Sequence, residues 1–267
     1  MWIDTHCHLD AHEFGVQSLD LAAQAQARGV TMVVIPAVER GNFGAVQALA
    51  QQAPNACYGL GIHPIYVPQA REEDLDFLRE AVARAMEDPR FVAVGEIGLD
   101  FFVPMLNEPA MRDKQVFFLR EQLKIARDFG LPVLCHVRKS QDQLLKHVRQ
   151  IGPPGGIAHA FNGSFQQAQS YIDCGFKLGF GGNLTFTRAL QIRRLATELP
   201  LSSIVMETDA PDIAPSWLHP GVNTPAETAA IGEVLAALRG DAPACVARAT
   251  TKNALDVMPR LRALMAG

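Results

Sequence analysis

The sequence has few cysteines, and they form no pattern that would build a disulfide framework or a cysteine-based metal site. The 267 residues include five cysteines, which are scattered along the chain without a Cys-x-x-Cys pair. No apolar run is long enough to cross a membrane. The chain opens directly into a short apolar stretch rather than a basic and apolar leader, so we expect no signal peptide and a cytoplasmic protein.

Positively charged residues are also fewer than negatively charged ones. Lysine and arginine number 24 against 28 aspartates and glutamates, which gives a net charge of −4. This balance argues against a broad basic surface that grips duplex nucleic acid. It does not exclude a local positive site, because bound divalent metals add charge that the sequence count omits.

The arrangement of apolar runs predicts a single (β/α)8 TIM barrel domain over residues 1–267. Hydrophobic residues make up 48% of the chain, enough for one large core. Strand-like runs are expected at 1–3, 30–35, 57–62, 91–95, 131–135, 156–158, 176–180 and 203–207. Helical patterns follow most of them, at 19–28, 43–53, 75–86, 109–129, 144–148, 168–174 and 188–199. A C-terminal helix over about 241–267 is expected to pack on the outside.

This α/β alternation indicates a parallel sheet, and eight units indicate a closed barrel. A doubly wound open sheet is the main alternative. It would have fewer strands and usually a glycine-rich phosphate turn after the first, where this chain has His-Cys-His.

The first strand leads into His6 and His8, which are separated by Cys7. In an extended backbone alternate side chains share a face, so the two imidazoles point the same way and Cys7 points away. Such a pair can chelate a divalent metal, although two of the eight histidines could also be close by chance.

Metal-type side chains recur at the ends of other strands: Glu96 after the fourth, His136 after the fifth, His159 after the sixth and Asp209 after the eighth. One such residue is more often a cap or a solvated loop residue. Six from five strands converge on one face of a barrel, where active sites are built. We therefore predict two divalent cations, with a carboxylate as the natural bridge. Mixed histidine and carboxylate ligands admit Zn, Mn or Mg.

Other polar residues near the strand ends allow two interpretations each. Asp4 and Glu207 could accept hydrogen bonds from ligand imidazoles or be structural polar groups. Arg138 could clamp a phosphate or form an ordinary salt bridge. His63 could meet substrate or metal, or cap a helix. The remaining histidines have no strand-end placement and are assigned to the surface or loops: His12, His147 and His219.

Six motifs at strand ends resemble those of the TatD-type metal-dependent hydrolases, a family of amidohydrolase-like barrels. They begin at Ile3, Gly61, Val94, Pro132, His159 and Glu207, and read IDTHCHLD, GIHP, VGEIGLD, PVLCHVR, HAF and ETDAP. The resemblance covers nearly the whole chain. It implies that His6, His8, Glu96 and Asp209 would hold one metal and that Glu96, His136 and His159 would hold the other. Members are described as DNases, several of which trim single strands from the 3′ end.

Three departures from the family pattern concern substrate preference rather than metal binding. Asn162 stands where Ser is frequent, Asn183 where Thr is common after a glycine pair, and Val137 where Ser is frequent. The amidohydrolase relatives often use a modified lysine on the fourth strand, where this chain has Glu96.

The sequence thus predicts a metal-dependent phosphodiesterase that acts on single-stranded ends of DNA. Asp209 would bind a metal and accept the proton of the attacking water, while Glu96 serves both metals. Arg138 and His63 would orient the phosphate. The alternatives are another ester or amide hydrolase, including one that acts on aminoacyl esters of tRNA, and a non-catalytic metal-binding scaffold. The oligomeric state stays open, and a monomer is compatible with the sequence.

Overall fold

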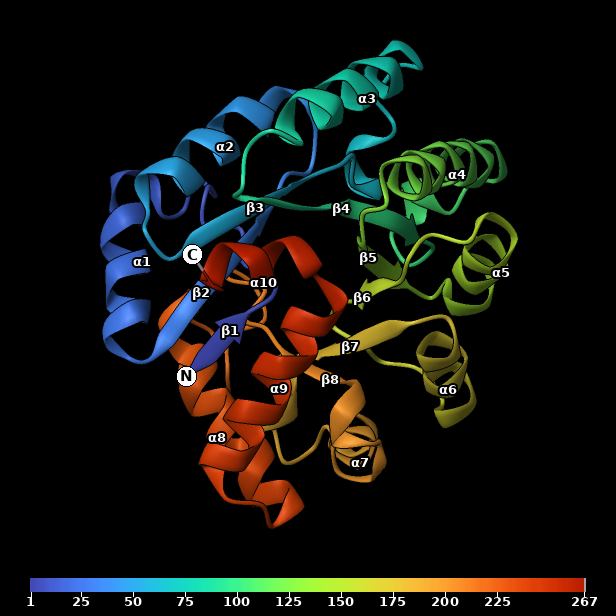
Figure 1. Cartoon of the computed structure of the whole chain (residues 1–267). Coiled ribbons are helices and arrows are strands. Elements are labelled where there is room, and N and C mark those ends of the chain that lie inside the picture. Colours follow the sequence, from blue (N-terminus) through green and yellow to red (C-terminus); the bar gives the residue numbers. More distant parts are fainter. Residues whose placement is uncertain (267) are drawn as a thin grey trace.

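Eight parallel strands, each hydrogen-bonded to the next in chain order, form the centre of the structure (Figure 1). The structure is a computed structural model that describes residues 1–266. The strands are β1 Trp2–Asp4, β2 Val30–Pro36, β3 Ala56–Leu60, β4 Phe91–Asp100, β5 Val133–Arg138, β6 Gly156–Ala158, β7 Phe176–Phe180 and β8 Ile204–Met206.

Backbone hydrogen bonds between the segments that continue β1 and β8 close this sheet into a ring. The Thr5 amide donates to the Met206 carbonyl at 3.0 Å, and the Asp209 amide donates to the His6 carbonyl at 2.8 Å. The His8 amide continues the ladder by donating to the Ala210 carbonyl at 2.8 Å. The predicted (β/α)8 barrel is confirmed.

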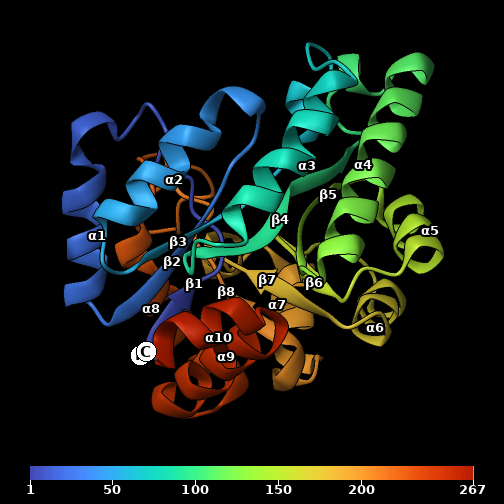
Figure 2. The same ribbon diagram turned by 45° about the horizontal axis from the view of Figure 1, so that its top comes forward.

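Helices surround the ring of strands and connect one strand to the next (Figures 1 and 2). They are α1 Ser18–Ala27, α2 Phe43–Gln52, α3 Glu73–Ala85, α4 Pro109–Phe129, α5 Gln141–Ile151, α6 Phe165–Asp173, α7 Leu190–Glu198, α8 Thr228–Arg239, α9 Pro243–Val257 and α10 Pro259–Ala266. Short 3-10 turns are η1 Gly15–Gln17, η2 Arg40–Asn42, η3 Pro64–Tyr66, η4 Pro104–Leu106, η5 Gly182–Thr185, η6 Leu201–Ser203 and η7 Pro225–Glu227. Within residues 1–266, no helix is both long and apolar enough to cross a membrane.

The predicted helix over 109–129 is confirmed with those bounds, because both of its ends are marked in the sequence. Pro109 occupies the first position of α4, where no backbone N–H is needed for the helix. Gly130 ends the helix with φ at 66°, a left-handed conformation that glycine adopts without steric cost.

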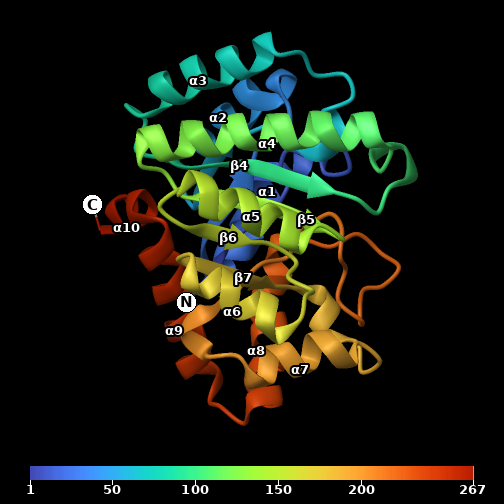
Figure 3. The same cartoon turned by 90° about the vertical axis from the view of Figure 1, so that its right-hand side faces the viewer.

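Two apolar layers hold the barrel together. The larger layer lies between the strands and the surrounding helices. The smaller one fills the barrel at its N-terminal end, where Val34 and Leu134 meet Met258 and Leu261 from the C-terminal region. Figure 3 shows α9 and α10 at the end of the barrel where the strands begin. Burial of a side chain such as Leu261 contributes roughly 1.5–3 kcal/mol, so these helices close this end of the barrel and stabilise it.

The C-terminal region differs from the expected single helix. It forms α9 and α10, which separate at Met258 because Pro259 has no N–H to continue the ladder of α9. The helices also cover the end of the barrel rather than only its outside. The preceding helix α8 was absent from the sequence-based assignment.

Strand β4 is longer than expected and extends to Asp100 instead of ending before Glu96. The residues after Glu96 keep the strand pattern, since Ile97 and Leu99 are both fully buried in the outer apolar layer. The register with β5 shifts between Val94 and Ile97, and after this shift Gly98 pairs with His136 and Asp100 pairs with Arg138. Glu96 and His136 therefore project from within strands, where their backbones are held by the sheet.

Candidate metal centre

The barrel brings the six metal-type residues of the sequence together at the C-terminal ends of the strands. His6 and His8 follow β1, Glu96 lies in β4 and His136 lies in β5. The other two follow β6 and β8: His159 and Asp209. Three overlapping groups of histidine and carboxylate side chains occur here, and within each group the candidate ligand atoms lie within 4.8 Å of one another. The six residues and His63 make up all three groups.

One side of the cluster has the spacing of a tetrahedral metal site. The Nε2 atom of His6 lies 3.3 Å from Nε2 of His8, 3.2 Å from Oε2 of Glu96 and 3.5 Å from Oδ1 of Asp209. The Nε2 atom of His8 lies 3.3 Å from the same glutamate oxygen and 3.7 Å from the same aspartate oxygen. Ligands about 2.1 Å from a tetrahedral ion are roughly 3.4 Å apart, and these five distances are close to that spacing.

The other oxygen of Glu96 belongs to a second group. Its Oε1 atom lies 2.8 Å from Nε2 of His159 and 3.2 Å from Nδ1 of His136, and these two nitrogens are 3.3 Å apart. Within residues 1–266, every ion-pair partner of the Glu96 carboxylate is a histidine. The two oxygens thus face separate groups of nitrogens, which is the geometry that a bridging carboxylate requires.

The electrostatics of this cluster hold Glu96 in its charged form. Burial raises its pKa, but the imidazoles of His63, His6 and His159 outweigh burial and lower the pKa well below its usual range. Burial disfavours charged His8, yet the hydrogen bond and charge of Glu96 raise the pKa of His8 to about 9. The pKa of His159 rises to about 10 although burial opposes this, because the charges of Glu96 and Asp209 favour its cation. Protons therefore compete with a cation for these imidazoles.

A residue that the sequence reading did not assign holds His136 in place. Oδ2 of Asp100 lies 3.1 Å from Nε2 of His136, while Oδ1 of Asp100 accepts the amides of Phe102 at 2.8 Å and Val103 at 3.0 Å. Asp100 therefore links a candidate ligand to the loop after β4. The even spacing of positions 96, 98 and 100 was the available signal, since alternate residues of a strand share a face.

Comparison with known proteins decides the family. A family model described as TatD related DNase matches residues 3–259. The chain belongs to the TatD family. The uncharacterized metal-dependent hydrolase YjjV of Escherichia coli K12 is 37% identical over 254 residues, which span 94% of this chain and 95% of YjjV.

A solved structure and a named exonuclease extend this similarity. The crystal structure of YjjV, described as a TatD homolog, matches with a TM-score of 0.91 at 35% identity and covers 97% of this chain and 98% of that chain. A protein named 3′-5′ ssDNA/RNA exonuclease TatD, from Erwinia billingiae, is 28% identical over 259 residues, 94% of this chain and 96% of that protein. The chain is thus a metal-dependent hydrolase of the TatD family, as the motifs implied.

His63 of this TatD-family chain caps a turn, which is one of the two interpretations that the sequence left open, and it also lies beside Glu96. Its Nδ1 accepts the amide of Ile65 at 3.0 Å and so caps η3, and its Nε2 lies 3.4 Å from Oε1 of Glu96. Burial lowers the pKa of His63 to about 4, against the opposing charge of Glu96, so the ring is neutral. A neutral ring whose Nδ1 accepts carries its proton on Nε2. Although His63 lies close enough to be a ligand, it is placed to donate a hydrogen bond.

Arg138 stands apart from the six clustered residues. Its side chain is exposed, and its guanidinium lies 3.8 Å from the centre of the exposed Phe102 ring. Lys139 lies 4.9 Å from the same ring, so two cations flank one aromatic side chain on the rim of the site.

Of the two interpretations that the sequence left open for Asp4 and Glu207, the structure supports structural polar groups and shows no hydrogen bond from a ligand imidazole to either carboxylate within residues 1–266. The Asp4 carboxylate accepts the Thr208 amide at 3.0 Å and the Thr208 hydroxyl at 2.6 Å, and it also accepts the His6 amide at 3.2 Å. Glu207 accepts the Ala160 amide at 2.5 Å. Both carboxylates therefore brace the backbone. Asp4 does so where the ends of β1 and β8 meet, and Glu207 does so at the segment that follows β6.

The structure also places two cysteines and the three histidines that have no strand-end position. Cys7 and Cys135 are fully buried in the outer apolar layer, as strand alternation predicted. His12 and His219 are exposed. The assignment of His147 to the surface or a loop is wrong, since it is buried within α5, where its Nδ1 lies 3.3 Å from Nη1 of Arg120.

Proposed function

We propose that this TatD-family hydrolase is a nuclease that removes nucleotides from single-stranded ends of DNA with the help of two divalent cations. The observation that carries the proposal is the position of Glu96, whose two oxygens each face a separate group of ligand atoms. The exonuclease name of the Erwinia relative supports a nucleic-acid substrate.

The ligand sets follow from the distances around Glu96. His6, His8, Asp209 and Oε2 of Glu96 would hold one cation. Oε1 of Glu96, with His136 and His159, would hold the other. Cations bound there would neutralise charge on a phosphoryl group and make a water molecule more acidic near neutral pH.

Asp209 is the candidate proton acceptor. Its side chain is 14% exposed, whereas Glu96 is 2% exposed, so water reaches the aspartate more readily. Burial raises the pKa of Asp209 above its usual range, although His159 and His8 oppose the shift. A carboxylate that is reached by water beside the candidate cation sites is placed to accept the proton of an attacking water molecule.

Two donors are available to orient the phosphate. Nε2 of His63 carries a proton beside the cluster, and the exposed Arg138 guanidinium can form two parallel hydrogen bonds with a phosphate. Arg138 is 42 positions away from Glu96 in the sequence but pairs with Asp100, which is on the same strand as Glu96.

The experiment is an end-labelled oligonucleotide assay with protein that is reconstituted with Zn, Mn or Mg. We expect stepwise shortening of single-stranded DNA from its 3′ end, and Glu96→Gln in parallel should lack this activity. Parallel reactions with single-stranded RNA, an aminoacyl ester of tRNA and a simple amide test the other hydrolase classes. Turnover of the ester or amide without DNA shortening under any metal would contradict the proposal. Metal binding with no turnover of any substrate would favour a scaffold.

A further inference from the structure

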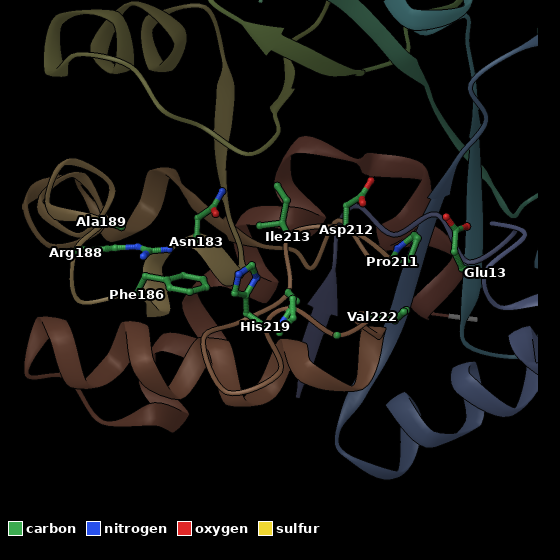
Figure 4. Close-up of a pocket in the computed structure, with 13 residues that line it drawn as sticks. Glu13, Asn183, Phe186, Arg188, Ala189, Pro211, Asp212, Ile213, His219 and Val222 are labelled. Carbon is green, nitrogen blue, oxygen red and sulfur yellow. The ribbon is translucent and has the colours of Figure 1, made fainter. Parts of the chain in front are cut away.

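A cleft of about 630 Å³ lies beside the candidate metal centre (Figure 4). It is lined by the loop between β7 and α7, which contributes Asn183, Phe186 and Arg188, by the loop between β8 and α8, and by Glu13 from the segment after β1. Asn183 and Ile213 also line a smaller pocket that includes Asp209. The cleft therefore adjoins the surroundings of the candidate proton acceptor. Its volume lies within the range of small-molecule sites.

One end of the cleft presents aromatic rings from both loops beside the Arg188 guanidinium. The half-buried Phe186 ring meets the exposed His219 ring edge to face, with 5.6 Å between ring centres and an interplanar angle of 83°. The Arg188 guanidinium lies 5.4 Å from the centre of the Phe186 ring. Aromatic faces and arginine planes stack with nucleobases without regard to sequence.

The opposite side of the cleft carries negative charge. Asp212 and Glu13 both line it, and both are exposed. Figure 4 shows Asp212 and Glu13 away from the Phe186 end, with Ile213 between Asp212 and that end and Pro211 between the two carboxylates. Carboxylates accept hydrogen bonds from hydroxyl groups and repel phosphates, so this side favours a strand end over a continuing backbone.

Direct contacts join the loop after β7 to the loop after β8. A Cβ on Gly182 would collide with the Ile213 carbonyl, so the loops touch where that glycine stands. The Ser216 amide donates to Oγ1 of Thr185 at 2.8 Å, which joins the loops a second time. Buried Asn223 donates from Nδ2 to the Thr208 and Asp212 carbonyls at 2.9 Å and 3.0 Å. These contacts hold the cleft open in advance of binding.

We propose that this cleft binds the terminal nucleoside of a nucleic-acid strand while the phosphate of that nucleotide lies at the metal centre. The base stacks on Phe186 beside His219 and Arg188. The free hydroxyl of the sugar faces Asp212 and Glu13, which exclude a further phosphate. This inference rests on the proposed nuclease function and assigns the preference for strand ends to this cleft.

A binding experiment tests the cleft without relying on turnover. Deoxyadenosine 5′-monophosphate and 2-deoxyribose 5-phosphate share the phosphate and the sugar, so the metal-loaded protein should distinguish them only through the base. We expect the mononucleotide to bind at least about fivefold more tightly by calorimetry, since stacking of one base on an aromatic side chain changes affinity roughly 5- to 150-fold. Phe186→Ala should remove most of this difference.

Matched variants separate the cleft from general surface effects. Phe117→Ala removes another exposed phenylalanine, on α4, and should leave mononucleotide binding unchanged. Deoxyadenosine 3′,5′-bisphosphate should bind more weakly than the monophosphate to the wild type, and Asp212→Asn should narrow that gap. Asp20→Asn, an exposed change on α1, should not narrow it.

The outcomes distinguish failure of the cleft from failure of the proposed function. Equal binding of the mononucleotide and the sugar phosphate, or no effect of Phe186→Ala, would overturn the cleft assignment even if oligonucleotides were degraded. Base-dependent binding that requires Phe186, in a protein that degrades no oligonucleotide, would uphold the nucleoside site and reject the nuclease function.

Discussion

Nε2 of His136 lies 3.1 Å from Oδ2 of Asp100, and the other nitrogen of the same ring lies 3.2 Å from Oε1 of Glu96. A neutral imidazole has one proton, and the Asp100 carboxylate favours its location on Nε2. Nδ1 then keeps its lone pair on the side of Glu96. Asp100 thereby orients His136, a candidate ligand of the second group around Glu96.

Replacement of Asp100 by asparagine should weaken metal binding in the second group about 10- to 100-fold. The amide oxygen of asparagine can still accept the Phe102 and Val103 amides, so the loop after β4 should keep its conformation. What changes is the partner of His136, because an amide NH₂ does not accept its proton. Metal titration of Asp100→Asn against Asp20→Asn is the measurement. Equal affinities for the second equivalent of metal in both variants would reject this role for Asp100.

The sequence was sufficient to predict the barrel and the clustering of six side chains, because both depend on simple rules. Alternation of strands and helices determines the sheet, and in a parallel barrel all carboxyl ends of the strands meet on one face. It was not sufficient for Asp100, whose contact with His136 depends on the register between β4 and β5. It left two interpretations open for Asp4, because the contact of Asp4 with Thr208 depends on how β8 lies against β1. Contacts between distant segments are not visible in local patterns.

Removal of the Glu96 carboxylate should affect both ligand groups at once. Glu96→Ala is expected to lose nearly all activity and much of the bound metal, because no other carboxylate in the described cluster contacts both His6 and His136. The apolar layers lie elsewhere, so the variant should still fold. Elemental analysis, turnover and circular dichroism provide the readouts. A purified variant that kept both metals and wild-type turnover would show that Glu96 is not a bridge.

Replacement of Cys7 and of its neighbour His8 should affect the metal content of the protein differently. Cys7→Ser should leave metal content nearly unchanged, since Cys7 is fully buried in the outer apolar layer. The buried hydroxyl should instead lower the free energy of unfolding, by about 1–3 kcal/mol if it lacks a partner. His8→Ala should lower metal content sharply, because its Nε2 atom lies among the ligand atoms. Metal analysis and denaturant titration of both variants test this contrast. Similar loss of metal from the two would mean that both side chains face the site.

Metal binding at pH 7 should release protons. The pKa of His8 is raised to about 9 and that of His159 to about 10, so both imidazoles are protonated at pH 7 when no cation is bound. A cation needs neutral imidazoles, and it must therefore displace up to about two protons at pH 7 and almost none above pH 10. Affinity should rise with pH over this range. Calorimetry in two buffers with different ionisation enthalpies measures the release, and identical heats in both buffers at pH 7 would contradict the prediction.

The last prediction concerns how an acidic protein engages a polyanion. With a net charge of −4, the protein has no surplus of cations for a wide binding groove. Attraction must come from the bound metals and from a few groups such as Arg138 and Lys139, which flank Phe102 on the rim. Arg138→Ala should therefore weaken substrate binding while metal content stays the same. Arg149→Ala, an exposed change on α5, is the matched control and should have little effect.

A contact with so few charges should depend only weakly on salt and should favour strand ends. Each phosphate neutralised on a single strand contributes about −0.7 to the slope of log affinity against log salt, so roughly one to three phosphates give a slope of about −0.7 to −2. A small site at the mouth of the barrel accepts a free end without displacing a complementary strand, so linear single strands should be degraded much faster than circular ones. Closed circular duplex should resist the enzyme for the same reason. Binding at several salt concentrations with fixed metal, and parallel digestion of linear and circular single strands, are the measurements. Rapid cutting of the circular strand, or a slope steeper than about −4, would show that the enzyme grips an extended stretch of backbone instead of an end.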